Sequence, residues 1–404
     1  MVGESSGHKA EYVEDLMKQL DAHRKWVQGL RGGRPADLGQ ADLSGLSLPK
    51  AVLRKARLTG ACLTHIDLSG ADLGAAILIM ADLSRSDLRG ADLMGADLRG
   101  ACLNGANLAD ANLAGTDFGV GSIATANPMV RFTGTPTPAR RTELRDADLS
   151  RALMRGAKLA DCDLTGAELV DADLTCADLR GAILVATDLS GATLTSAELK
   201  GAVLSGARID ETVLAQLVEL GVERRAKLAS VADRLPALIE QHRHWMESHG
   251  SEGQRLELDM ADLEGANLAG YDLSGALIRR SNLDGANLRD AVLVMADLAY
   301  CSMAGADLSG ADLSGCALRR VNLSGASLKD AVLKSVPIVG DPERPWPTNL
   351  QSARLVNADV RCRVAEGVLL GYSDLIGAQL NLALLKGADL TGARYVRPAA
   401  EASE

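Results

Sequence analysis

Aromatic side chains are scarce in this sequence: Phe, Trp and Tyr together make up 2% of its 404 residues. An irregular globular core needs bulky rings to fill uneven space, so this scarcity argues against an ordinary globular interior. The excess of acidic over basic residues is also small, because the formal net charge is only −10. Such a mildly acidic balance does not favour a broad nucleic-acid-binding surface.

Cysteines and long apolar runs are equally uninformative about a site. The seven cysteines are an odd number without a CxxC pair, which is typical of a reducing compartment. Cys162, Cys301 and Cys316 stand where neighbouring segments have Ala, so we interpret them as small core residues. The N-terminus is polar and acidic, and no apolar run reaches the roughly 18–20 residues that span a bilayer. We therefore expect a soluble, cytoplasmic protein.

Motifs for catalysis are missing as well. None of the six histidines combines with Cys or a carboxylate at a spacing typical of metal ligands. The sequence also has neither a GxxxxGK[ST] phosphate loop nor a GxSxG nucleophile elbow. We predict no enzymatic activity, no metal and no cofactor.

What the sequence does contain is a period of five. From Ala36 it reads ADLGQ ADLSG LSLPK AVLRK ARLTG, and this pattern extends over four runs with 59 repeats, of which 50 have Leu at the centre. Neither the helical period of 3.6 nor the strand period of 2 explains it. Ala and Leu flank one variable residue, as two inward positions of a short strand would. The next two residues, often Ser-Gly or Arg-Gly, favour a tight turn.

The repeats ADLSG, ADLRG, ANLAG and ADLTG match the consensus A-(D/N)-L-x-x, so the chain resembles the pentapeptide-repeat family over most of its length. The resemblance implies four pentapeptides per coil and a right-handed quadrilateral parallel β-helix, which is a β-solenoid. It also implies a class of partner, because the family includes DNA mimics that protect DNA gyrase from inhibitors.

Two segments outside the repeats have apolar residues at helical spacing. They are 11–30, which precedes the first repeat, and 212–247, which has a predicted break at Pro236. Residues 69–83 are repeated in 284–298, so we predict a tandem duplication into two rods with α-helical caps and a linker. The predicted parts are 1–34, an N-terminal helical cap; 35–216, the first solenoid with an inserted loop at 124–142; 217–253, a helical linker or cap; 254–395, the second solenoid with an inserted loop at 339–348; and 396–404, a disordered tail.

Both helical segments carry a His-x-x-Trp pair about a dozen residues before a solenoid begins. The open end of a solenoid exposes its core and unpaired strand edges, and a helix can cover them. We predict that these pairs support the caps; they are His23 with Trp26 and His242 with Trp245.

Apolar residues at outward positions are candidates for binding a partner, because exposed apolar clusters mark contact surfaces. The alternative is that they pack on the helices or on the other rod. The candidates are Ile77, Ile79 and Met80 in the first copy and Val292, Val294 and Met295 in the second. Ile183 and Val185 form a third, smaller case.

The inserted loops are further candidates, since binding residues often lie on loops. The first loop is basic and could hold phosphate or an acidic protein; the second exposes a Trp between prolines. The alternative is a bulge that merely tolerates insertion. The residues concerned are Arg131, Arg140, Arg141, Arg145 and Trp346.

Asp or Asn fills the outward position of many repeats, and aligned columns could form an acidic face. DNA of the same length, about 70 Å, would carry roughly 40 negative charges, far more than the net −10 of this chain. We therefore favour a non-enzymatic interaction scaffold with an unidentified protein partner. A DNA mimic that binds a type II topoisomerase is the first alternative. A self-assembling protein, joined through rod faces or ends, is the second. Direct binding of nucleic acid or membrane is not expected.

Overall fold

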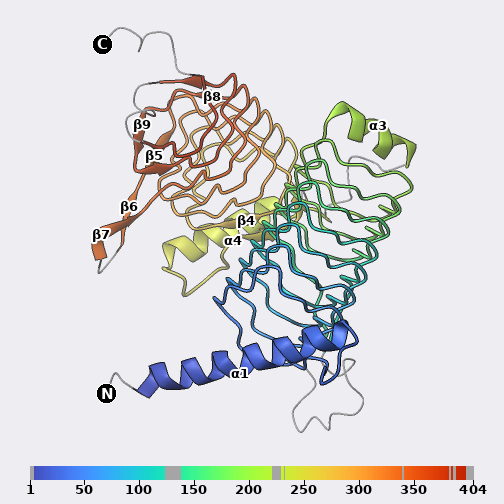
Figure 1. Cartoon of the computed structure of the whole chain (residues 1–404). Helices are drawn as coiled ribbons and strands as arrows, with labels where there is room; N and C mark the ends of the chain where they lie inside the picture. Colours follow the sequence, from blue (N-terminus) through green and yellow to red (C-terminus); the bar gives the residue numbers. More distant parts are fainter. Residues whose placement is uncertain are drawn as a thin grey trace. The chain divides into compact units, whose positions relative to one another are not determined.

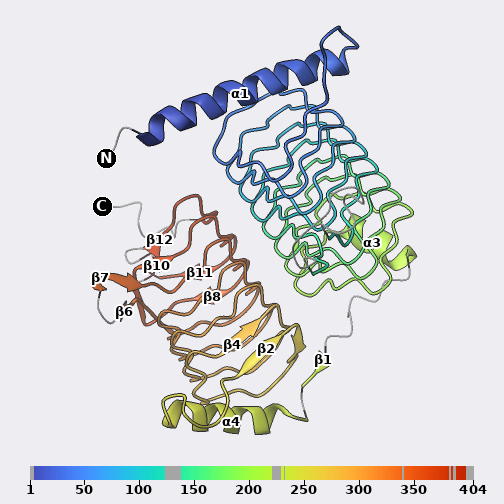
Figure 2. The ribbon, with the colours of Figure 1, turned by 90° about the horizontal axis from the view of Figure 1, so that it is seen from below.

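The computed structural model describes residues 4–122, 138–220, 229–231, 233–338, 341–381, 384 and 388–396, with side chains from residue 13 onward except at 229–230 and 341–343. The chain forms two compact units. The first consists of Met1–Ala202 and Arg208–Glu223, and the second of Val203–Ala207 and Arg224–Glu404. Each unit is a solenoid of stacked coils (Figures 1 and 2).

Away from the insertions each coil contains 20 residues, as four pentapeptides require. In the first unit the outward residues pair in parallel at this spacing, for example Arg57 with Ile77 and Ile77 with Asp97. In the second unit Asp272 pairs in the same way with Val292. The pairing confirms a parallel β-solenoid with one repeat per side.

The hydrogen bonds of a single repeat explain why the period is strict. The Leu58 N–H donates to the Ile77 carbonyl of the next coil (2.8 Å), and the Ala61 N–H closes the corner on the Leu58 carbonyl (3.1 Å). The outward Asp or Asn then accepts from the amide two residues later, as Asp67 does from Ser69 (3.0 Å). Asp and Asn recur because this local bond stabilises the turn.

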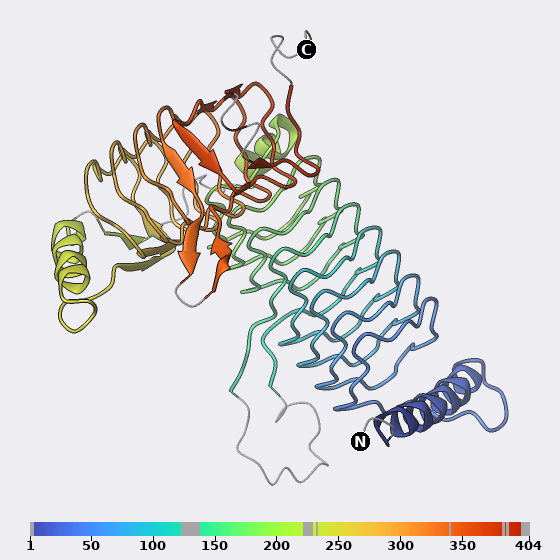
Figure 3. The same cartoon turned by 90° about the vertical axis from the view of Figure 1, so that its left-hand side faces the viewer.

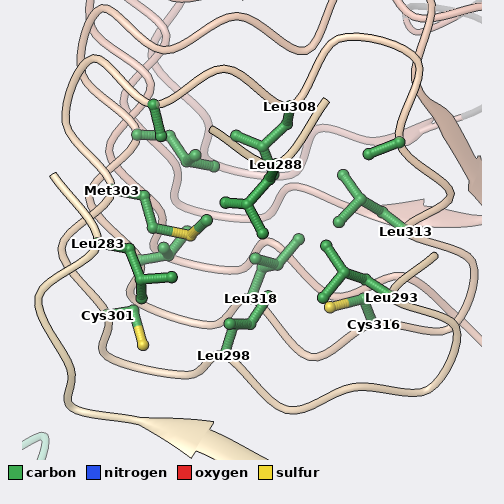
Figure 4. Packing of buried hydrophobic residues seen from close by; sticks show 14 of the residues in the cluster. Leu283, Leu288, Leu293, Leu298, Cys301, Met303, Leu308, Leu313, Cys316 and Leu318 are labelled. Atoms are coloured by element: carbon green, nitrogen blue, oxygen red, sulfur yellow. The ribbon is translucent and has the colours of Figure 1, made fainter. Parts of the chain in front are cut away.

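Leu and Ala fill the interior of both solenoids. In the second unit Leu283, Leu288 and Leu293 point inward from successive sides of one coil (Figure 4), and all three are fully buried. Cys301 and Cys316 lie buried at Ala positions, as expected. Burial raises the pKa of the Cys301 thiol to about 12, so this thiol stays protonated in the core.

Two helices pack on the first unit. Helix α1 (Glu4–Val27) buries Leu16 and His23, and α3 (Glu211–Glu219) buries Val213 and Leu217. The side chain of Gln216 in α3 replaces a neighbouring coil, because its Oε1 accepts from the Leu194 N–H (2.6 Å) and its Nε2 donates to the Ala192 carbonyl (3.2 Å).

In the second unit β1 (Ala229–Ser230) precedes α4 (Leu235–Glu247), which buries Leu235 and Ile239 against the core. Its further strands are β2 (Glu257–Asp259), β3 (Ala261–Asp262), β4 (Leu277–Arg279), β5 (Val332–Lys334), β6 (Val336–Ile338), β7 (Asp341–Trp346), β8 (Asp359–Val360), β9 (Val364–Glu366), β10 (Val368–Leu369), β11 (Gln379–Leu380) and β12 (Ala388–Asp389). All strand pairs are parallel except β6 with β7. No helix within the described ranges is long and apolar enough to cross a membrane.

The helical prediction for 212–247 is partly wrong. Among its described residues, those between α3 and α4 include strand β1, and Pro236 stands in the first turn of α4 rather than at a break within a helix. Proline suits this position because the first helical N–H groups have no intrahelical partner. The repeat pattern also extends too far at two places: Leu214 lies in α3, and Ile338 lies exposed in β6.

The two solenoids differ by one repeat between the helix and the interruption. In the first, the side that starts at Leu38 continues through successive coils to Phe118, after which the insertion follows. In the second, the distance from Leu258 to Leu333 is one pentapeptide shorter. The first insertion therefore leaves from the same side of the coil as the first repeat of its solenoid. The second insertion leaves from the side that comes one repeat earlier.

Candidate functional site

At both insertions, the residue at which the chain leaves the solenoid pairs antiparallel with a residue at which it returns. In the first unit Gly121 pairs antiparallel with Arg140. In the second, β6 and β7 form a hairpin that begins at Val336, whose partner is Trp346, and it projects from the coils (Figure 3). Strand β7 occupies most of the inserted loop predicted at 339–348. Most of the predicted loop at 124–142 lies outside the described residues, including Arg131.

A buried threonine anchors each returning strand. The Thr142 hydroxyl donates toward the Leu98 and Gly119 carbonyls (3.0 and 3.1 Å) and accepts from the Gly100 N–H (2.9 Å). Thr348 donates in the same way toward Leu313 and Lys334 (2.8 and 3.2 Å). The bonds to the Leu98 and Leu313 carbonyls are a general feature of the coils, because Thr116 and Thr187 make them to Leu93 and Leu164 where no insertion follows. The bonds to the Gly119 and Lys334 carbonyls are particular to the insertions, and they join each returning segment to the residue just before the insertion leaves.

Replacement of Thr348 by Val keeps the shape of the side chain but removes the hydroxyl. We expect the free energy of unfolding of the second unit to fall by about 1–3 kcal/mol, because the Leu313 and Lys334 carbonyls lose their buried donor. Urea unfolding followed by circular dichroism measures this. Thr348→Ser is the control and should retain more of the stability than the Val variant. Equal losses in both variants would contradict a role for the hydroxyl.

A glycine corner lies beneath each hairpin base. A Cβ placed on Gly315, which has a φ of +64°, would lie 2.7 Å from Met295 Sδ, 2.9 Å from Val336 Cγ2 and 3.4 Å from Trp346 Cδ1. These three side chains therefore converge over Gly315. Gly100 has the corresponding position in the first unit, where Met80 Sδ and the Arg140 carbonyl are its neighbours.

The apolar candidates are not uniformly exposed. Ile77 and Met295 are 37% and 41% exposed, whereas Ile79 is only 3% exposed. The prediction that Ile79 faces water is wrong, because its side chain is buried, whereas Met94 at the equivalent position of another repeat is exposed; burial at this position therefore depends on the neighbouring side chains and not on the repeat. The same holds for Ile183 and Val185, which are buried. The other candidates are half-buried, namely Met80, Val292 and Val294.

The basic candidates also separate. Arg141 is exposed and Arg140 is half-buried. Arg145, in contrast, forms an ion pair at 2.7 Å with the buried Asp163. Its guanidinium is therefore already paired within the first solenoid. Trp346 is 47% exposed. The structure adds Lys334 and Arg344, both exposed, which the sequence interpretation missed although Arg344 belongs to the predicted loop.

Arg140 and Trp346 occupy equivalent positions. Each pairs with the first residue of its hairpin, and each stands two residues before the anchoring threonine. The two units thus have the same backbone arrangement at this position but different side chains. The first unit has the cation of Arg140, and the second has the indole of Trp346.

The two His-x-x-Trp pairs make matching contacts. His23 Nδ1 accepts from the Ala36 N–H (2.9 Å), and His242 Nδ1 accepts from the Leu256 N–H (3.1 Å). Each ring stacks on its Trp, Trp26 or Trp245, with centroids 5.5 Å apart. Both imidazoles are fully buried, and burial lowers the pKa of each. Each Nδ1 can accept its backbone hydrogen bond only while the imidazole is neutral.

The outward carboxylates do stack in columns, but many are paired. Arg54 lies 2.9 Å from Asp72 and 3.1 Å from Asp92. The guanidinium of Arg89 pairs with Asp87 and lowers its pKa. Among the residues whose positions are described, no group of three His, Cys, Asp or Glu side chains could hold a metal ion.

Comparison with known protein families identifies one family. The family model for pentapeptide repeats matches in several overlapping copies that together cover more than half of the chain, within residues 36–119, 142–209, 257–293 and 296–334. No curated protein matches.

Three similar solved structures belong to named proteins. HetL, a pentapeptide repeat protein involved in heterocyst differentiation regulation from the cyanobacterium Nostoc sp. strain PCC 7120, is 20% identical, with a TM-score of 0.20, and the match covers 93% of this chain and 95% of HetL. QnrB1, a plasmid-mediated fluoroquinolone resistance protein, is 14% identical, with a TM-score of 0.14 and coverage of 90% and 93%. Rfr23 from the cyanobacterium Cyanothece 51142 is 29% identical, with a TM-score of 0.12 and coverage of 32% and 60%.

Proposed function

Because the chain belongs to the pentapeptide-repeat family, we propose that it is a non-enzymatic interaction protein that presents rigid β-helix surfaces to a protein partner. The observation that carries this proposal is the pair of hairpin bases. Each is anchored by a buried threonine and lies beside a methionine at a glycine corner. A packed Leu and Ala interior supports the same conclusion, since small-molecule sites are concave.

The finer architecture is part of the proposal. We propose a right-handed winding in both solenoids, with α1 and α4 closing their starting ends through His23 and His242. Helix α3 would close the far end of the first solenoid through Gln216. The domain boundaries and the cytoplasmic location given above remain predictions.

The proposal is tested by affinity purification from the native host with the full chain as bait. We expect a specific partner to be captured by the wild type and lost from the double variant Met80→Asp, Met295→Asp, because a carboxylate buried by the partner would disrupt an apolar contact. Met94→Asp is the matched control, since Met94 is similarly exposed (49%) but lies at neither hairpin base. Equal capture by a folded double variant would contradict the proposal.

The second candidate function is that of a DNA mimic that binds a type II topoisomerase. One column of outward carboxylates favours it. Asp67, Asp87, Asp148, Glu168 and Asp188 lie along the same side of the first solenoid. One carboxylate per coil, at about 4.8 Å, is nevertheless a lower density than one DNA charge per roughly 1.7 Å. Supercoiling by purified gyrase, with and without the protein, decides this; no effect at micromolar protein would exclude it.

A further inference from the structure

A methionine sulfur lies at the base of the second hairpin. Met295 occupies a coil corner with a φ of +58°, and its N–H donates to the Ser314 carbonyl of the next coil (2.9 Å). Gly315 occupies the same corner of that coil and has no side chain, so the thioether lies over it: a Cβ placed on Gly315 would be 2.7 Å from Sδ. Met295 is 41% exposed. Solvent therefore reaches a side chain that is also packed against the coil.

The same corner is close to both strands of the hairpin. The Cβ position on Gly315 lies 2.9 Å from Val336 Cγ2 and 3.4 Å from Trp346 Cδ1, and these two residues are register partners in β6 and β7. The distances of 2.7 and 3.4 Å together place the sulfur within about 6 Å of Trp346 Cδ1, near the roughly 5 Å of sulfur–aromatic contacts. The thioether of Met295 thus joins the coil to the hairpin.

Backbone pairing contributes little to holding the two strands of this hairpin together. Pro337 lies within β6, and Pro342 and Pro345 lie within β7. Proline has no N–H to donate. The register of the pair is also irregular between Val336 and Ile338. Side-chain contacts at the base therefore carry a larger share of the stability of the hairpin than they would in a regular pair.

From this combination we infer that Met295 makes the second hairpin sensitive to oxidation, because a methionine sulfoxide at this position releases β6 and β7 from the coil. In the reaction a peroxide transfers one oxygen atom to the thioether sulfur. The O–O bond breaks, an S–O bond forms, and hydrogen peroxide is reduced to water while the sulfur is oxidised. The polar sulfoxide turns toward solvent and gives up its apolar contacts with Val336 and Trp346. The inference goes beyond the proposed function, because it concerns the hairpin itself and holds for any partner.

Other methionines lack this arrangement. Met17 and Met94 are more exposed than Met295, at 53% and 49%, but neither lies at a hairpin base. Met154 and Met303 are fully buried in the interior, where a peroxide reaches them poorly. Exposure alone thus selects several methionines for oxidation, and the contacts with β6 and β7 distinguish Met295 from them.

The first unit has a related corner with weaker features. Met80 Sδ would lie 2.6 Å from a Cβ on Gly100, but Arg140 stands there in place of the indole. Met80 is also half-buried, whereas Met295 is exposed. We therefore expect Met80 to be oxidised more slowly, with a smaller effect on the pairing of Gly121 with Arg140.

The test treats the intact chain with hydrogen peroxide and follows each methionine by peptide mass spectrometry. Hydrogen exchange of the amides of Val336 and Trp346 then reports on the hairpin. We expect Met295 to be oxidised about as fast as Met94. Exchange of the two amides should become about threefold faster or more, because the sulfur–aromatic contact is lost. Methionine sulfoxide reductases with a thiol reductant should restore the slow exchange.

Three variants separate oxidation of Met295 from other damage. Met295→Leu keeps an apolar side chain without a sulfur, so peroxide should no longer accelerate the exchange. Met295→Gln resembles the polar sulfoxide and should exchange fast without peroxide. Met94→Leu is the matched control, because it removes a thioether of similar exposure, and peroxide should accelerate the exchange of its hairpin as it does in the wild type.

Unchanged exchange after full conversion of Met295 to the sulfoxide would overturn the inference. Equal acceleration by peroxide in the Met295→Leu chain would also overturn it, and so would oxidation of Met295 as slow as that of the buried Met154. None of these results would contradict the proposed function, since no partner takes part in the experiment. The two failures are therefore distinguishable.

Discussion

Phe118→Ala is expected to lower the free energy of unfolding of the first unit by about 3–5 kcal/mol. Phe118 is fully buried in the coil from which the first insertion leaves. Its backbone is fixed by hydrogen bonds, for example from its N–H to the Lys158 carbonyl (2.9 Å). Because stacked coils cannot collapse easily into the space that the ring leaves, the loss should approach the upper part of this range.

Urea unfolding, combined with hydrogen exchange of the amides around Phe118, measures the effect and its location. Contacts in a solenoid are made only between neighbouring coils, so we expect the loss of protection to be confined to the first unit. Phe118→Leu is the control. It restores the residue found at most repeat centres, and it should cost less than about 1.5 kcal/mol. A loss below that value for the Ala variant would show that the coils do close around the cavity.

Acid should weaken both units through His23 and His242. Each Nδ1 accepts a backbone N–H, and a protonated imidazole cannot accept. Burial lowers the pKa of both residues, so the unfolded chain binds these protons more readily than the folded one. Their stabilisation is therefore fully present above the ordinary pKa of about 6.5 and is lost as the pH falls from there toward the lowered pKa.

The expected size follows from linkage: each unit by which the pKa is lowered corresponds to about 1.4 kcal/mol per histidine. Unfolding free energies measured by urea titration between about pH 7.5 and 4.5 test this. Carboxylates with a lowered pKa, such as Asp87, act in a separate window below their usual 3.8, where stability is also lost as the pH falls.

The double variant His23→Asn, His242→Asn separates the two causes. The Asn side-chain oxygen can take the place of Nδ1 as an acceptor but does not titrate. We expect this variant to lose the pH dependence in the histidine window. The variant with Leu at both positions should be less stable at all pH values, by about 1–3 kcal/mol per site. An unchanged pH dependence in the Asn variant would mean that other groups are responsible.

Much of the fold could be predicted because the repeat is local. Most of the described Leu centres are buried, and Cys301 and Cys316 occupy Ala positions in the core, as the period of five predicted. The coils contain four repeats, as the family resemblance implied. The errors lie where the pattern continues by coincidence. Leu214 and Ile338 keep the period of five, yet Leu214 lies in α3 and Ile338 lies in a hairpin. At these places the packing of the chain against the end of a coil or within an insertion determines the secondary structure.

The candidate site was predictable only in part. Ile77, Met295 and Trp346 are exposed, as their outward positions and the prolines suggested. The burial of Ile79 and the ion pair of Arg145 could not be foreseen, since both depend on what the adjacent coils contribute. Lys334 and Arg344 were missed because their relation to Trp346 requires the hairpin.

The sequence by itself determined the solenoid, since each pentapeptide specifies one short side and one corner whatever its neighbours are. The tertiary structure alone decided how the exceptions are used. It brought Met295 and Trp346 together over Gly315, placed Arg140 at the equivalent position of the first unit, and made His23 and His242 acceptors for the first coils. These contacts join residues from different coils or elements, and a period of five carries no information about them.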